Sequence, residues 1–243
     1  MNCPLRLLVV LLLTAVSVRA ESLPFMRPAL LGHHSRSLVN LIDTAALAKR
    51  GQGDAVVLFS CVVNTIGDAY AVQLYRATPN SNLLKEELKG RFNQAQFEPA
   101  VYRHAHQTVY LSGTVMFKVI DGKPRLVVFL HQDEDAMKRG VDFIAPQMMF
   151  TLAGTKFKGI YWPPGAPGHE GTANLRVAVN EQGKVTAVKT IYEYPAAMGF
   201  GAAAAGPTKD ADFIPGYRNG KPVACDFEFP VLFSGPGVQM KSG

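Results

Sequence analysis

The sequence predicts an α+β protein made of two tandem β-β-α-β repeats, each a small antiparallel sheet with a helix on one face. Three observations predict this class. The chain repeats itself at a spacing of 116 residues, apolar and polar residues alternate at the period of strands, and glycines stand where hairpins would turn. With 243 residues, 48% hydrophobic and 18% charged, the chain can bury a large core, which excludes a generally disordered protein.

Residues 1–20 predict a secretory signal peptide. Arg6 precedes an apolar run at residues 7–16, and small residues stand before an expected cleavage after Ala20. The run is shorter than the roughly 20 residues of a membrane span, and an uncleaved signal anchor is the alternative. Cleavage lowers the formal charge from +6 to +4, which is too small and too scattered to favour nucleic-acid binding.

An internal duplication organises the rest of the chain. Residues 64–99 and 180–215 share nine identities in 36 aligned pairs, including Gly67 with Gly183, whereas about two or three are expected by chance. The predicted organisation is a leader at 21–44, a degenerate first repeat at 45–130, a connection at 131–160, a second repeat at 161–233 and a flexible tail at 234–243.

The first repeat is expected to begin with a hairpin of strands at 53–64 and 69–76, turning at Gly67. A helix at 83–90 follows, capped by residues 80–82 and ended by Gly90, and the last strand is expected at 108–119. The first strand is apolar on both faces. Its second face should therefore be covered, by the other repeat or by residues 126–130.

The second repeat is expected to have strands at 171–180, 184–192 and 223–233. Its counterpart of the helix, residues 196–206, is rich in alanine and glycine and is expected to be frayed or loop-like. Alternation in the last strand places Val223, Cys225, Phe227 and Phe229 on the core face.

The motifs of the second repeat resemble the C-terminal domain of TonB-type energy transducers. The matching residues are the Glu-Gly pair at 170–171, the hairpin at 182–183 and the Asn-Gly-Lys-Pro-Val run at 219–223. The first repeat keeps Gly67 and the Phe-Glu-Pro-Ala run at 97–100, but has Arg-His-Ala-His-Gln at 103–107 in place of the Asn-Gly turn. Both copies are thus identified as TonB C-terminal-like, the first more weakly.

This resemblance implies a periplasmic domain of Gram-negative bacteria that binds an extended receptor peptide along an exposed strand edge, commonly the last strand. Carried over to this chain, the candidate partner-binding residues are Val223, Ala224, Cys225, Asp226, Phe227, Glu228 and Phe229. The partner would be a periplasmic or outer-membrane protein or peptide.

The length of the spacer before the first repeat limits whether the protein could transmit force across the periplasm. Residues 21–44 reach less than about 90 Å even when fully extended, which is short for a force-transmitting transducer. We therefore expect an exported, non-enzymatic periplasmic binding protein with no stable membrane span. The alternative is a signal-anchored component that engages an outer-membrane transport receptor.

No catalytic residue, cofactor or metal site is predicted. An unfavoured alternative is a metal-dependent enzyme in which His104, His106 and His131 converge. Residues 132–135 are acidic but lack the spacing of a calcium loop, and we interpret them as a solvated connection. Cys61 and Cys225 fall in different repeats, so two separate buried thiols are favoured over a disulfide.

Overall fold

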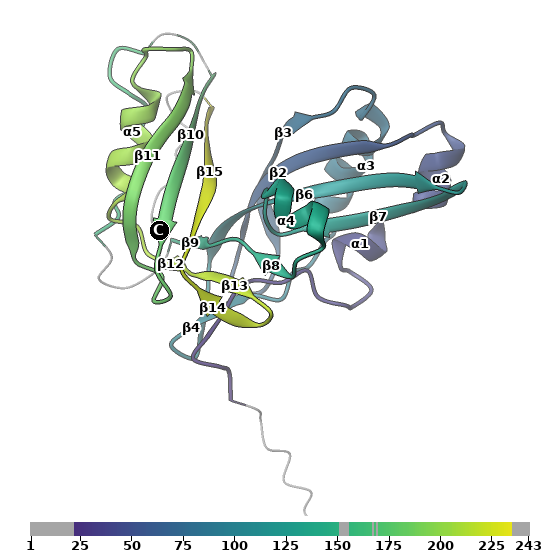
Figure 1. Cartoon of the computed structure of the whole chain (residues 1–243), viewed down its shortest axis with the longest axis horizontal. Helices are drawn as coiled ribbons and strands as arrows, with labels where there is room; N and C mark the ends of the chain where they lie inside the picture. Colours follow the sequence, from purple (N-terminus) through teal and green to yellow (C-terminus); the bar gives the residue numbers. More distant parts are fainter. Residues whose placement is uncertain (1–21, 151–155, 167, 169, 235–243) are drawn as a thin grey trace, which may run out of the picture.

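A computed structural model describes residues 22–150, 156–166, 168 and 170–234. The predicted signal peptide, and the predicted tail beyond residue 234, lie outside the described residues. The protein is a mixed α/β structure with mostly antiparallel sheets. Figure 1 shows two halves side by side, which we define as the first half, from β1 to β7, and the second half, from β8 to β15.

The sheet of the first half has the order β3-β2-β6, with β7 on the far side of β6. It consists of β2 (Ala55–Val63), β3 (Ala69–Ala77), β6 (Val109–Ile120) and β7 (Lys123–Phe129). Helix α3 (Asn82–Phe92) covers one face through Leu84, Leu88 and Phe92, and the Phe92 ring lies 5.0 Å from that of Phe59. The short helices α1 (Leu38–Leu41) and α2 (Thr44–Lys49) lie near β7.

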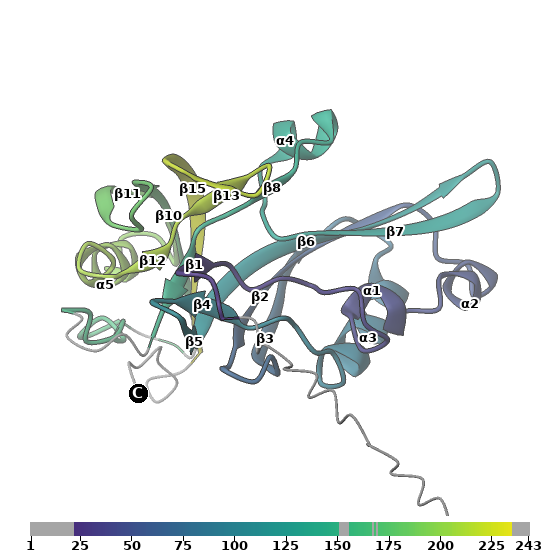
Figure 2. The same ribbon diagram turned by 90° about the horizontal axis from the view of Figure 1, so that it is seen from below.

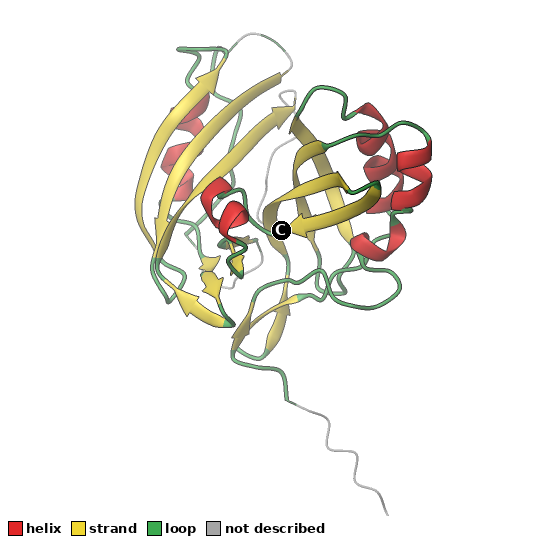
Figure 3. Ribbon diagram, turned by 45° about the vertical axis from the view of Figure 1, so that its right-hand side comes forward, coloured by secondary structure: helices red, strands yellow, loops and turns green. Residues whose placement is uncertain are grey.

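The sheet of the second half has the order β11-β10-β15. Its elements are β10 (Glu170–Val179), β11 (Val185–Tyr194), α5 (Phe200–Thr208) and β15 (Cys225–Ser234). Phe200 and Ala204 of α5 are fully buried beside the odd-numbered residues of β10 and β15. The even-numbered residues of these two strands therefore form the opposite face, which α5 leaves uncovered (Figure 3).

The pairing registers of the two halves agree at a spacing of 116 residues. Leu58 pairs with Thr114, and Asn174 pairs with Pro230. The hairpin ladders β2-β3 and β10-β11 both shift register at the same place, after Leu58 and after Asn174. The small hairpins also agree, because Ala100 pairs with Gln107 and Gly216 pairs with Val223.

Short strands complete the fold between the two larger sheets (Figure 2). In the first half, β1 (Met26–Arg27) pairs with β4 (Ala100–Tyr102), which pairs with β5 (Ala105–Gln107). In the second half, β8 (Phe143–Ile144) pairs with β13 (Gly216–Arg218), which pairs with β14 (Lys221–Val223). Strand β9 (Gln147–Met149) joins the halves, because it pairs with both β6 and β12 (Phe213–Ile214).

The two halves share buried surface. Val62 and Tyr110 of the first sheet lie in the same apolar cluster as Leu175 and Phe229 of the second half. The Tyr110 ring lies 5.4 Å from that of Phe229, and its hydroxyl donates to the Pro230 carbonyl over 2.8 Å. The second face of the β2 sheet is thus covered by the other half around Val62 and Tyr110, whereas residues 123–129 extend the sheet as β7.

Three expectations about elements were wrong. Helix α3 continues through Gly90 to Phe92, and its N-cap Ser81 makes no side-chain capping bond. Residues 196–199 form turns as expected, but the alanine- and glycine-rich segment is helical from Phe200 on, where Glu193 accepts the backbone N–H groups of Gly199 and Gly201 at the start of the helix. The last strand is interrupted, because Val223 belongs to β14 and pairs with Gly216 instead of β10.

Candidate partner-binding cleft

Strand β15 has one ladder neighbour, β10, in the described part of the chain. Proline has no N–H, so the pair of Asn174 with Pro230 cannot be a hydrogen-bonded pair of the antiparallel ladder. The Pro230 carbonyl instead accepts from Tyr110. Because pairs alternate along an unbroken ladder, the backbone N–H and C=O groups of Asp226 and Glu228 also point away from β10.

A cleft of about 520 Å³ opens beside this edge, between the two halves. One wall comes from the uncovered face of the second sheet, with Asn174, Arg176, Tyr192, Asp226, Glu228 and Pro230. The other wall comes from Leu58, Tyr75 and Arg76 of the first sheet and from residues 131–135. These last residues include the start of α4 (Glu134–Arg139), a helix capped by Asp133, whose carboxylate accepts the Ala136 N–H over 2.9 Å.

Two buried polar atoms in the wall of the cleft have no hydrogen-bond partner among the described residues. They are Nε2 of His131, a residue 1% exposed, and Oδ1 of Asn174, a residue 8% exposed. The Asp133 N–H donates to Nδ1 of His131 over 3.2 Å, so in the neutral ring Nε2 carries the proton. The Asn174 side chain donates through Nδ2 to Glu228 over 2.7 Å, which orients Oδ1 as a free acceptor.

The ring of His131 lies between two aromatic rings, with centroids 5.3 Å from both Phe129 and Phe143. Burial lowers the pKa of His131 below its usual 6.5, against the smaller opposing effect of the Asp133 charge. The ring is therefore neutral near pH 7 and acts as a hydrogen-bond donor through Nε2. Within the same wall, Gln132 donates through Nε2 to the Tyr75 hydroxyl, and burial raises the pKa of that hydroxyl.

The residues that the sequence singled out occupy different environments. Phe227 and Phe229 are buried in the second-half core, as expected from the alternation. Asp226 and Glu228 are exposed and line the cleft, whereas Val223 and Cys225 are half-buried and Ala224 is exposed. Burial raises the pKa of the Cys225 thiol to about 11.

The three histidines of the metalloenzyme alternative lie in different environments. His104 Nδ1 contacts the Leu23 carbonyl at 2.7 Å, His106 is exposed in β5, and His131 is buried. Within the described ranges, no group of three or more His, Cys, Asp or Glu side chains is placed to hold a metal ion. Cys61 and Cys225 are both free thiols, and Cys61 is fully buried in the first-half core.

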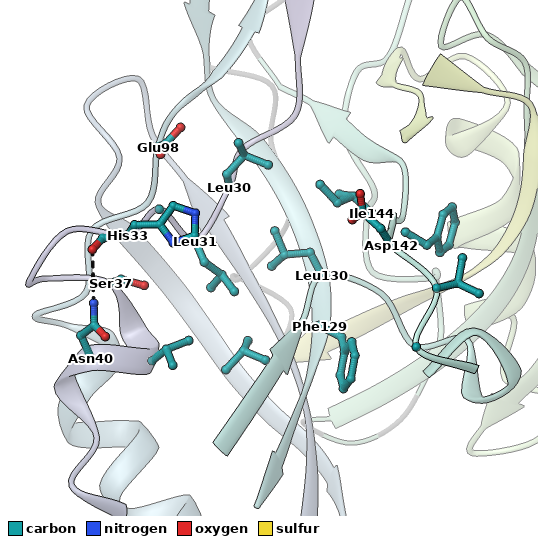
Figure 4. A pocket seen from close by; sticks show the side chains of 16 residues that line it. Leu30, Leu31, His33, Ser37, Asn40, Glu98, Phe129, Leu130, Asp142 and Ile144 are labelled. Carbon is teal, nitrogen blue, oxygen red and sulfur yellow. Dashed lines mark hydrogen bonds between the residues drawn. The ribbon is translucent and has the colours of Figure 1, made fainter. Parts of the chain in front are cut away.

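A second cavity, of about 680 Å³, is lined by Phe129 and Phe143, the two aromatic residues that contact His131. Figure 4 shows Leu30 and Leu31 facing Phe129 and Leu130, with Ile144 across the opening. Phe143 lines both cavities. This second cavity is mainly apolar, whereas the cleft beside β15 is lined mostly by polar and charged side chains.

Sequence reasoning did not single out Asn174, Arg176, Tyr75 or Arg76, and it assigned residues 132–135 to a solvated connection. The alternation of β10 does place Asn174 and Arg176 on the wet face. Nothing in the order of the residues indicates that this face meets residues 131–135 across a cleft. That convergence depends on how the two halves pack.

Comparison with known proteins supports the resemblance for one part of the chain. Residues 166–234 match the family model of the Gram-negative bacterial TonB protein C-terminal domain. The match covers one copy, and the predicted first repeat lies outside it. Neither the curated proteins nor the solved structures contain a match to the chain. None of the helices within the described residues is long and apolar enough to cross a membrane.

Proposed function

From the family match at residues 166–234, we propose that this protein is an exported, non-enzymatic periplasmic protein that binds an extended segment of a partner along β15. A TonB C-terminal-like segment favours a protein-interaction role in the Gram-negative envelope. The observation that carries the binding mode is the row of outward backbone groups at Asp226 and Glu228, beside an open cleft. Unpaired groups on a strand edge supply affinity for an added strand.

The first half of the chain already shows strands added to the edge that corresponds to that of β15. Strand β6 holds the same place and register in the first half as β15 does in the second. Its outer edge is covered by two of the chain's own strands, β7 and β9, both antiparallel to it. On β15 the Pro230 carbonyl is taken by Tyr110, but no strand of the described residues pairs with the outer edge at Asp226 and Glu228, so a segment from another protein can pair there.

We also propose that the two halves arose by duplication of one β-β-α-β unit. The shared registers support this, and so does the local chemistry of the turns. Asn64 and Asn180 each accept two backbone N–H groups through their side-chain oxygen. Gly67 and Gly183 each accept the N–H of a phenylalanine, Phe97 or Phe213, over 2.8 and 2.9 Å. After the duplication, the edge of β6 in the first copy became covered by the chain's own strands, whereas β15 in the second copy kept an edge without a paired strand.

The experiment compares Asp226→Pro with Asp226→Ala. Both variants lose the carboxylate, but only proline loses the outward N–H, and Pro230 already occupies the same row of the strand. A photo-crosslinking residue placed at the exposed position Arg176 reports on the cleft in whole cells.

We expect the crosslinked adduct to fall about tenfold in Asp226→Pro, because one backbone hydrogen bond is lost and the ring blocks a close strand. Asp226→Ala should retain most of the adduct. Equal adduct in both variants, or no adduct from position 176 in the parent protein, would show that this edge is not the site.

A further inference from the structure

We propose that the cleft selects a cationic segment, so that the extended peptide bound along β15 carries lysine or arginine where it faces Asp226 and the start of α4. This inference rests on the proposed function and specifies the chemistry of the partner. It is carried by the charge of the cleft walls and by the two unpartnered polar atoms that line them.

The charge of the cleft is opposite in sign to that of the chain. The whole sequence has a formal charge of +6. The cleft, however, is lined by the carboxylates of Asp133, Glu134, Asp135, Asp226 and Glu228 and by the guanidinium groups of Arg76 and Arg176. Carboxylates of both walls are included, so a segment that lies between the walls meets negative charge on either side.

Existing ion pairs do not neutralise this excess. Arg176 lies 3.7 Å from Glu228, and Lys138 lies 2.7 Å from Glu134, so these two carboxylates already have cationic partners. Asp133, Asp135 and Asp226 make no ion pair within 4 Å among the described residues. Three carboxylates without a cationic partner, against the single remaining guanidinium of Arg76, leave a site that attracts cations and repels anions.

The unpartnered atoms indicate that the cation is part of a peptide. Nε2 of His131 is a buried donor without an acceptor, and Oδ1 of Asn174 is a buried acceptor without a donor. A peptide group offers both complements, a carbonyl oxygen and an N–H. Because an unsatisfied buried polar group is costly, a strand that enters the cleft gains these bonds in addition to those with β15.

A bare metal ion satisfies these groups less well. The carboxylates are divided between α4 on one wall and β15 on the other, and the described residues hold no group of three metal-ligating side chains. Long, flexible lysine and arginine side chains can reach both walls from one backbone, whereas an ion requires its ligands to converge.

The test uses three fluorescent, end-capped peptides of nine residues with the same alternating Val and Thr framework and with Lys, Ser or Glu at three positions. Fluorescence anisotropy on the full mature chain measures each dissociation constant. We expect the lysine peptide to bind at least about tenfold more tightly than the glutamate peptide. This preference should shrink when ionic strength rises from about 0.01 M to about 1 M, because the screening length falls from about 30 Å to about 3 Å.

Matched variants locate the effect. Asp135→Asn combined with Asp226→Asn removes two free carboxylates from the cleft and should reduce the preference for lysine at least about threefold. The control, Glu181→Gln combined with Asp210→Asn, removes the same charge at exposed positions outside the cleft and should leave the preference unchanged. His131→Phe keeps the ring packing but loses the Nε2 donor, and should weaken all three peptides about equally.

The outcomes separate this inference from the function on which it rests. If the lysine and glutamate peptides bind equally and both lose affinity in Asp226→Pro, the strand edge is the site and the charge inference is wrong. If the control variant lowers the lysine preference as much as the cleft variant, the effect comes from net charge and the inference is also overturned. If no peptide binds, the inference is overturned, and crosslinking from position 176 decides the proposed function by itself.

Discussion

Single residues at the main hairpin turns explain why the two halves share a register. The backbone φ angle is 90° at Gly67 and 78° at Gly183, a range that residues other than glycine rarely adopt. A Cβ atom at these positions would lie 2.1 Å from the Phe97 carbonyl oxygen and 1.8 Å from that of Phe213. Only glycine allows the segment after the helix to approach each turn, so these glycines set where the hairpin meets the rest of the unit.

The burial of His131 leads to a prediction about pH dependence. Its pKa is lowered in the folded state by burial, so the unfolded chain takes up the proton first as the pH falls. Stability that is present above the usual pKa of 6.5 should therefore be lost as the pH drops below it. His131→Phe should remove this loss while keeping the contacts with Phe129 and Phe143.

The measurement is urea unfolding of the parent and His131→Phe proteins at about pH 7.5 and about pH 5. The parent should lose more stability than the variant between the two values. An equal loss in both proteins would assign the acid sensitivity to other groups.

At the scale of elements, α5 shows how packing overrides helix propensity. Its sequence contains Gly201, Gly206 and Pro207, yet it forms a helix from Phe200 to Thr208. Phe200 is fully buried, and the centroid of its ring lies 5.1 Å from that of Trp162 and 5.0 Å from that of Phe233. Burying this ring contributes about 1.5–3 kcal/mol, which offsets the cost of two glycines in a short helix, about 1 kcal/mol each.

The two glycines inside α5 should respond oppositely to alanine. A Cβ at Gly201 would lie 2.6 Å from Cγ2 of Thr190, whereas a Cβ at Gly206 meets nothing within 4 Å. Gly206→Ala should stabilise the protein by about 0.5–1 kcal/mol, because alanine loses less backbone entropy. Gly201→Ala should destabilise it by about 1–3 kcal/mol, because the helix must move away from β11.

Chemical denaturation of both variants measures the difference, and each serves as the control for the other. Stabilisation by both substitutions would mean that α5 is not held closely against Thr190.

At the scale of the whole molecule, the halves are coupled through β9 and through Tyr110. Gln147 of β9 is 1% exposed, and its side chain makes hydrogen bonds of 2.7 and 2.9 Å with the backbone N–H and carbonyl of Ala29 in the first half. Because Val62 and Tyr110 share the core of the second half, unfolding one half would expose the other. The structure therefore indicates one cooperative unit.

Tyr110→Phe tests this coupling. The buried hydroxyl is lost and the Pro230 carbonyl is left without its partner, so stability should fall by about 0.5–1.5 kcal/mol. Trp162, the single tryptophan, packs on the second-half cluster, so its fluorescence reports on a half that does not contain the substitution.

The midpoint of the Trp162 transition should shift together with that of the circular dichroism signal from the whole fold. A Trp162 midpoint unchanged by Tyr110→Phe would show that the halves unfold independently.

The local order of elements was predictable because its causes are local. The strands at β2, β3, β10 and β11 follow from apolar or alternating runs and from glycine at the turns, and they lie within two residues of the predicted bounds. Sequence reasoning was less reliable where burial decides, as in α5 and at the end of α3. The break of the last strand at Ala224 was not predictable either, because it arises from pairing between Val223 and Gly216.

The sequence by itself determined the alternating strands, the tight turns and the buried faces, because each depends on residues a few positions apart. Only the tertiary structure decided that β7 covers the edge of β6 while the edge of β15 faces a cleft. It also brought His131 and Asn174 into the walls of that cleft. Their convergence depends on the packing of one sheet against another, for which no short-range pattern in the chain provides a signal.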